Sequence, residues 1–196
     1  MSNPKIRKYL ISSSLANMFC GFSSVQSTHC MLLASGVGDA TAVASSISIN
    51  FIGKDILGQI ASIPFVLKFS KIAKENPQTH LRGSIFIFET ANLIECTTPL
   101  FPHLFIPLAI AGNIGKNIGF IGTGSFNANI ISKLSSDVIS DYSLISVCNT
   151  ISFSLGMSLG LLCSININSY GLRMSIMVIL GIARYYALKN SAKLFD

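Results

Sequence analysis

Residues 104–124 read LFIPLAIAGNIGKNIGFIGTG, an apolar run with one charged residue, Lys116, near its middle. A helix that crosses a membrane needs about 20 predominantly apolar residues, so this stretch is long enough to span a bilayer. A charge at the bilayer centre costs about 2.5–3.5 kcal/mol or more, and such a residue usually has a partner or a function. The stretch therefore predicts a transmembrane helix that turns a lysine toward the interior of a bundle.

The whole chain has the composition of a membrane protein. Of its 196 residues 50% are apolar and only 11% are charged, against about 25% charged in soluble domains; the mean hydropathy is +0.59. Lipid can accommodate this much apolar surface, whereas a soluble core of this size cannot. We expect one transmembrane domain over residues 9–190, preceded by a basic tail (1–8) and followed by a C-terminal tail (191–196).

Polar, Pro and Gly breaks divide the chain into apolar segments, as at Asn76-Pro77 and at Pro99 and Pro102. The pattern predicts an all-α fold, a bundle of about six transmembrane helices. The expected helices cover residues 9–35, 40–69, 81–101, 104–134, 142–165 and 170–189. Segments near 30 residues must tilt, kink or extend out of the bilayer.

Basic residues follow the loops of one side. With six helices, 11 of the 14 basic residues fall on the side of the termini, and only Arg173 falls on the other. The 11 are Lys5, Arg7, Lys8, Lys68, Lys71, Lys74, Arg82, Lys133, Arg184, Lys189 and Lys193. Such a bias marks the cytoplasmic side, or the matrix or stroma of an organelle. The net charge of +6 thus indicates membrane orientation, and we expect no nucleic-acid partner.

Eight of the charged or amide side chains inside the expected helices form the candidate substrate-binding site. They are Asn50, Lys54, Asp55, Glu89, Asn92, Glu95, Asn113 and Lys116. Lys54 and Asp55 point about 100° apart on a helix, so we expect each to pair with another helix rather than with its neighbour. Glu89, Asn92 and Glu95 recur every three residues, which makes a slowly drifting polar stripe.

The candidate residues include three acids and only two lysines, so one acid has no lysine to neutralise it. Lys54 and Lys116 can neutralise two of Asp55, Glu89 and Glu95, and the third would be protonated, hydrated or in contact with a ligand. One interpretation is a substrate site, an ion site or a proton relay in the middle of the membrane. The other is a buried salt-bridge cluster that fixes the register of the helices, and the residues leave both open.

Common catalytic and metal-binding patterns are absent from the sequence. It has no Walker loop, nucleophile elbow, HExxH motif or dinucleotide fingerprint. His29, His80 and His103 lie far apart in the sequence. The five cysteines have no CxxC spacing, so we interpret them as small buried hydrophobic residues. We expect no enzyme activity, no metal and no cofactor.

Closely spaced glycines indicate tight helix contacts. Gly115 and Gly119, like Gly156 and Gly160, are four residues apart, as in small-xxx-small packing motifs. We expect these pairs to pack within the bundle, with a dimer face as the alternative. Gly119, Gly122 and Gly124 together favour a kink or unwinding near Lys116.

The charged positions recur in motifs with a fixed order. Residues 50–58 read NFIGKDILG, residues 95–102 read ECTTPLFP, and Asn113 precedes Lys116 by three. This arrangement resembles the root UVB sensitive (RUS) family, with its Asn-Trp-x-x-Lys-Asp-Gly-x-Gly, Glu-x-x-Thr-Pro-Leu-Phe-Pro and Asn-x-x-Lys stretches. The likeness implies an integral membrane protein, plastid-associated in plants and linked there to seedling development, light response and vitamin B6 homeostasis. It implies no particular biochemical activity.

Two functions are expected from these observations. The first is transport of a small solute or ion through a polar site made by the second, third and fourth helices. The second is a multi-pass scaffold that does not transport and recruits partners through its basic face. The expected partners are the lipid bilayer, a further copy of this chain or a related family member, and a small-molecule substrate whose identity the sequence leaves open.

Overall fold

The computed structural model describes residues 4–36, 44–135, 137–167 and 169–192, without the side chains of 44–51, 66, 69–75 and 190–192. Across these ranges the fold is all-helical. The helices are α1 (Pro4–Ala34), α2 (Ala44–Glu75), α3 (Pro77–Cys96), α4 (Phe105–Leu134), α5 (Val138–Asn166) and α6 (Tyr170–Ala192). Two single-turn 3-10 helices, η1 (Thr98–Leu100) and η2 (Pro102–Leu104), join α3 to α4.

The expected helices are present, with different ends. Asn76 accepts a hydrogen bond from the Thr79 backbone N–H and caps α3, and Asp137 caps α5 in the same way through Ser140. These caps satisfy backbone donors that a helix start leaves free. α1 begins at Pro4 rather than at residue 9, so residues 4–8 are helical. α6 reaches Ala192, and residues 193–196 lie outside the described part.

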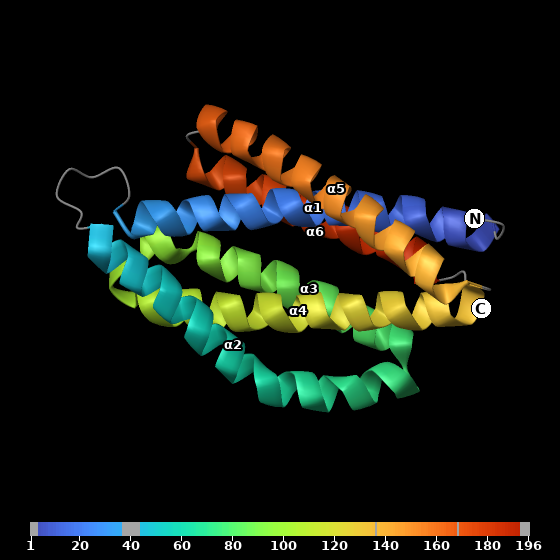
Figure 1. Ribbon diagram of the computed structural model, residues 1–196. Coiled ribbons are helices and arrows are strands. Elements are labelled where there is room, and N and C mark those ends of the chain that lie inside the picture. Colours follow the sequence, from blue (N-terminus) through green and yellow to red (C-terminus); the bar gives the residue numbers. More distant parts are fainter. Residues whose placement is uncertain (1–3, 37–43, 136, 168, 193–196) are drawn as a thin grey trace.

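The bundle has two groups of helices (Figure 1). α1 packs mainly against α5 and α6, whereas α3 and α2 pack against α4. The groups meet where α3 contacts α1 and α6. Leu188 near the end of α6 packs in the same cluster as Ile6 and Tyr9 near the start of α1, so these two ends of the chain lie at one end of the bundle.

Glycines set how closely the helices approach. A Cβ on Gly156 would lie 1.9 Å from the Met18 carbonyl oxygen of α1, and a Cβ on Gly119 would lie 2.6 Å from the Phe88 Cβ of α3. Both expected glycine motifs therefore pack within the bundle. The expected unwinding near Lys116 is wrong, because α4 is helical without a break from Phe105 to Leu134; the alternative, a kink, stays a prediction.

The surface of the bundle is largely apolar. Within the described part of the chain, three segments are long and apolar enough to cross a membrane: Pro102–Leu134, which contains α4, together with Val138–Asn166 and Tyr170–Lys189. On α5 and α6 large side chains such as Ile139 and Ile179 are 82% and 63% exposed. Continuous exposed apolar surface marks a membrane or protein contact, so the composition is consistent with membrane association.

The interior of the bundle holds buried polar side chains as well as apolar ones. The main apolar cluster lies at the end with the start of α1, and includes Ile6, Tyr9, Phe126 and Ile130. Further along α1, Gln26 and Ser27 are buried polar side chains, at 1% and 0% exposure. Several polar positions of the sequence therefore lie inside the bundle, beyond the main apolar cluster.

Candidate functional site: a buried charge network

The polar stripe of α3 faces three different helices. Residues three apart on a helix are rotated by about 60° from one another, because three steps of about 100° fall short of a full turn. Glu89 accordingly contacts α6, Asn92 contacts α1, and Glu95 contacts α4. The expected drifting stripe is therefore the element that connects the network.

Glu95 and Lys116 form the central ion pair. Lys116 Nζ donates to Glu95 Oε2 and to Ser27 Oγ at 2.7 Å. Ser27 Oγ lies 3.1 Å from Asn92 Oδ1, to which it can donate. The Glu95 and Lys116 side chains are only 1% and 12% exposed, so a buried anion and a buried cation neutralise each other across α3 and α4.

Glu89 pairs with Arg184 of α6, which was not among the candidate site residues. Arg184 Nη1 lies 2.6 Å from Glu89 Oε1, and Arg184 is 3% exposed. Its guanidinium also stacks 4.4 Å from the centre of the Phe88 ring. By sequence Arg184 counts among the basic residues on the side of the termini, and the structure buries it within the bundle. The third acid, Glu89, is therefore salt-bridged rather than protonated, hydrated or in contact with a ligand.

Lys54 and Asp55 form a third pair, on α2. Lys54 Nζ lies 2.5 Å from Asp55 Oδ1, which also accepts a hydrogen bond from Asn113 Nδ2 on α4 at 3.1 Å. The expectation that each residue pairs with another helix rather than with its neighbour is wrong, because Lys54 and Asp55 pair with each other. A lysine side chain is long enough to bridge the angle between the two positions. The Asp55 side chain is 51% exposed, whereas that of Lys54 is only 9% exposed, so the pair joins a buried cation to an anion at the surface of the bundle.

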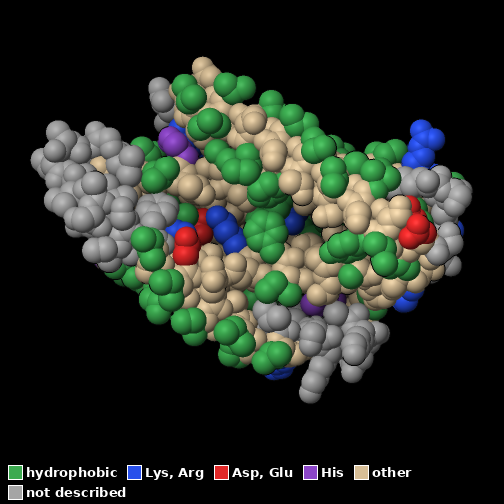
Figure 2. Space-filling view, viewed as in Figure 1, with side chains coloured by type: hydrophobic (Ala, Val, Ile, Leu, Met, Phe, Trp, Pro, Cys, Tyr) green, Lys and Arg blue, Asp and Glu red, His purple; other side chains and the backbone are tan. Residues whose placement is uncertain are grey.

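The structure thus divides the candidate residues into two groups. Glu89, Asn92, Glu95 and Lys116 join one network, and Lys54, Asp55 and Asn113 form a second, more exposed one. The side chain of Asn50 lies outside the described residues. Figure 2 shows Lys or Arg side chains beside Asp or Glu side chains in a recess of this face, with apolar side chains around them.

Sequence reasoning missed Ser27 and Arg184. A serine in an apolar helix is common, and no periodic signal separates Ser27 from the other serines of α1. Arg184 carried a stronger signal, because it falls inside the expected helix 170–189, several residues before its end. Arg173, the basic residue expected on the side opposite the termini, is 5% exposed and donates to the Ser164 and Ile167 carbonyls at the end of α5.

Replacing Ser27 with alanine tests whether the network holds the helices together. Ser27→Ala removes a partner of a buried lysine, and hydrogen bonds to charged groups contribute about 1.5–3 kcal/mol. We expect the free energy of unfolding in detergent to fall by that amount. Ser23→Ala is the matched control, because Ser23 is equally buried on α1 and its hydroxyl has no partner among the described residues. Equal effects of both variants would contradict a specific role for Ser27.

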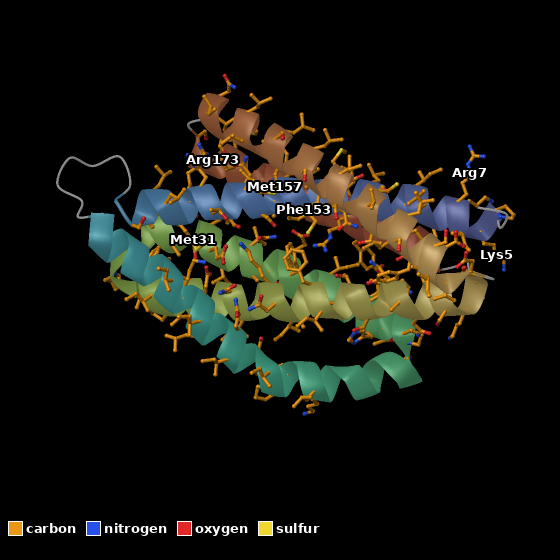
Figure 3. The ribbon with its side chains drawn as sticks, viewed as in Figure 1. Lys5, Arg7, Met31, Phe153, Met157 and Arg173 are labelled. Atoms are coloured by element: carbon orange, nitrogen blue, oxygen red, sulfur yellow. The ribbon has the colours of Figure 1, made fainter. Side chains whose placement is uncertain are left out.

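A neutral polar cavity lies between α1, α4 and α5. Its volume is about 310 Å³, and its polar lining includes Asn17, Thr123, Asn127 and Asn149. None of the described residues that line it carries a charge. Phe153 points from α5 toward the space between α1 and α4 (Figure 3) and, like Phe120, borders this cavity.

Aromatic rings separate the cavity from the charges. The Phe120 ring packs edge-on against Phe153 at 6.2 Å and against Phe88 at 4.8 Å, and Phe88 in turn stacks on Arg184. Within the described ranges no group of three or more His, Cys, Asp or Glu side chains could hold a metal ion. The arrangement offers hydrogen-bonding and charged groups to a solute, and no evident nucleophile.

These features define the class: an all-α protein with long apolar helices around a buried network of ion pairs. The chain belongs to the RUS family. The family model described as "Vitamin B6 photo-protection and homoeostasis domain" matches residues 3–191, which confirms the resemblance seen in the sequence.

Three relatives from Arabidopsis thaliana are similar to part of this chain. Protein root UVB sensitive 6 is 28% identical over 117 residues, covering 60% of this chain and 23% of the relative. Protein root UVB sensitive 4 is 30% identical over 114 residues, 57% of this chain and 22% of the relative. Protein root UVB sensitive 5 is 26% identical over 117 residues, which cover 56% of this chain and 23% of the relative. The matched region is thus under a quarter of each relative, and no solved structure matches.

Proposed function

We propose that this protein is a multi-pass membrane protein that carries a small polar solute or ion through the interior of a six-helix bundle. The apolar exterior supports the membrane part of the proposal. α1 and α3 contain many polar residues, but several of them, such as Ser13, Gln26 and Asn92, are buried against other helices. Their lower hydropathy therefore reflects the interior rather than the surface that lipid would contact.

The distribution of charge supports the orientation. The helix order places the start of α1, the end of α2, the start of α3 and the ends of α4 and α6 at one end of the bundle (Figure 1). Exposed basic residues at these ends include Lys5, Arg7, Lys68, Arg82 and Lys133. By the positive-inside rule this end faces the cytoplasm or the equivalent organelle compartment.

The observation that carries the transport proposal is the line of polar side chains from Lys116 through Ser27 and Asn92 to Glu89. Buried ion pairs are poor stabilisers, because desolvation offsets most of their attraction. Two such pairs with connecting hydrogen-bonding groups are therefore a costly way to hold helices together. In membrane proteins intramembrane ionisable residues usually mark pathways for ions, protons or substrates.

The polar cavity supplies a place where a solute could wait. Its amides already have protein partners, since Asn17 donates to the Ser13 carbonyl and Asn149 accepts from Ser13. Each amide has further donor and acceptor capacity, with which it could bind water or a polar solute. Rotation of the Phe120 ring, which stands between the cavity and Phe88, would join the cavity to the charged network. The proposed route therefore runs from the neutral cavity, past the Phe120 ring, to the ion pairs.

A charge-neutral double variant tests this function separately from folding. Lys116→Met with Glu95→Gln removes both charges and leaves neither one unpaired. We expect the double variant to insert at normal levels and to fail to restore the phenotype of cells that lack this protein. Full restoration would show that the pair is structural. Metabolite profiling of those cells then gives the solutes to test for uptake into proteoliposomes.

The basic end of the bundle favours a second candidate, a scaffold that recruits partners and transports nothing. Neutralising Lys68, Lys71 and Lys74 together distinguishes the two functions, because these residues lie at the end of α2, away from the network. The scaffold requires loss of function in this triple variant and normal function in the Lys116 and Glu95 double variant. Transport requires the opposite result.

A further inference from the structure

Three sulfur atoms from three helices meet in the interior. Cys96 Sγ, at the end of α3, lies 3.2 Å from Cys30 Sγ of α1 and 3.1 Å from Met177 Sδ of α6. The three residues are 1%, 0% and 2% exposed in the order Cys30, Cys96, Met177, and form a cluster of their own. Residues so far apart in sequence converge only because the three helices pack together.

We propose that Cys30, Cys96 and Met177 bind a soft monovalent metal ion of the Cu(I) type. Thiolate and thioether sulfurs are soft ligands that select Cu(I) over hard cations. Among the side chains of the cluster there is no carboxylate or imidazole, which would suit harder ions. Binding would release the thiol protons, since the thiolate is the metal ligand.

The geometry needs only a small adjustment for such an ion. Metal–sulfur bonds of about 2.3 Å in a flat three-coordinate site place the sulfurs about 4 Å apart. The two sulfur–sulfur distances in the structure are therefore about 0.8 Å shorter than such a site requires. Rotation of the side chains can supply this change. Cys30 borders a cavity of about 390 Å³, which provides room for this movement.

The surroundings suit an anionic set of ligands. Arg173 and His29 line the same cavity as Cys30, and the positive charge of the guanidinium would offset the negative charge of two thiolates on a monovalent ion. The cavity also reaches Pro99 and Ser164 near the ends of their segments, so it offers an ion a path toward the cluster from the end of the bundle opposite the termini.

Competition for Cu(I) tests the proposal on the full chain. The reduced protein, purified in detergent, is titrated anaerobically with Cu(I) against the chromophoric chelator bicinchoninate. We expect one Cu(I) to bind per chain, and we expect X-ray absorption spectroscopy to show that all atoms bonded to the copper are sulfur. Cys96→Ala should lower the affinity at least about 100-fold, since loss of a second-shell partner alone costs about 10- to 100-fold.

Two further variants keep the test decisive if Cys96→Ala misfolds. Met177→Leu conserves volume, which cores tolerate well, and should still weaken Cu(I) binding. Cys20→Ala is the matched control, because Cys20 is a fully buried cysteine of α1 outside the cluster; it should leave binding unchanged. Absence of Cu(I) binding, or equal loss in Cys20→Ala and Met177→Leu, would overturn the proposal.

Discussion

Lys116→Met should cause one of the largest losses of stability that a single substitution can produce in this protein. It leaves the Glu95 carboxylate, which is 1% exposed, without its cation. Removing one partner of a buried ion pair costs about 3–5 kcal/mol, because the remaining charge stays in a region of low dielectric. We expect a fall of that size in the free energy of unfolding in detergent.

Adding Glu95→Gln to this variant should recover most of the loss. The double variant no longer buries an unpaired charge, and replacing a whole buried pair is often neutral. A double-mutant cycle from thermal or denaturant unfolding gives the coupling between the two residues. Lys68→Met serves as the control, since Lys68 is exposed and should change stability by less than about 0.5 kcal/mol. Additive effects of the two substitutions would contradict the ion pair.

Gly156→Leu should separate α1 from α5. Its Cβ would lie 1.9 Å from the Met18 carbonyl oxygen, and a backbone atom cannot move aside as a flexible side chain can. Overpacking of a core costs about 1–3 kcal/mol and occasionally more, and we expect about 3 kcal/mol or more here, since α1 and α5 pack extensively. Thermal unfolding and the yield of monodisperse protein in detergent measure the effect.

Gly53→Leu is the matched control for this substitution. Gly53 lies inside α2, and a Cβ there would meet no atom within 4 Å. The same leucine should therefore be neutral or slightly stabilising, because glycine disfavours a helix by about 1 kcal/mol relative to alanine. If both variants unfolded alike, a general intolerance of leucine, rather than close helix packing, would be the cause.

The sequence alone was sufficient for the class of fold, the approximate helices and the family. Long apolar segments and Pro, Gly and Asn breaks are local signals, and they placed each helix within a few residues of its observed ends. The motifs around Lys54-Asp55 and Glu95 to Pro102 placed the chain in the RUS family, and the same residues pointed to a polar interior. The drift of Glu89, Asn92 and Glu95 along one helix also follows from spacing alone.

Only the tertiary structure decided which residues meet. A partner on another helix depends on the rotation and depth of both helices, and hydropathy encodes neither. The sequence placed Arg184 in the sixth helix but did not show that it pairs with Glu89, and it did not show that Ser27 contacts Lys116. For the same reason Cys30, Cys96 and Met177, which share no local motif, form a cluster only when α1, α3 and α6 pack together.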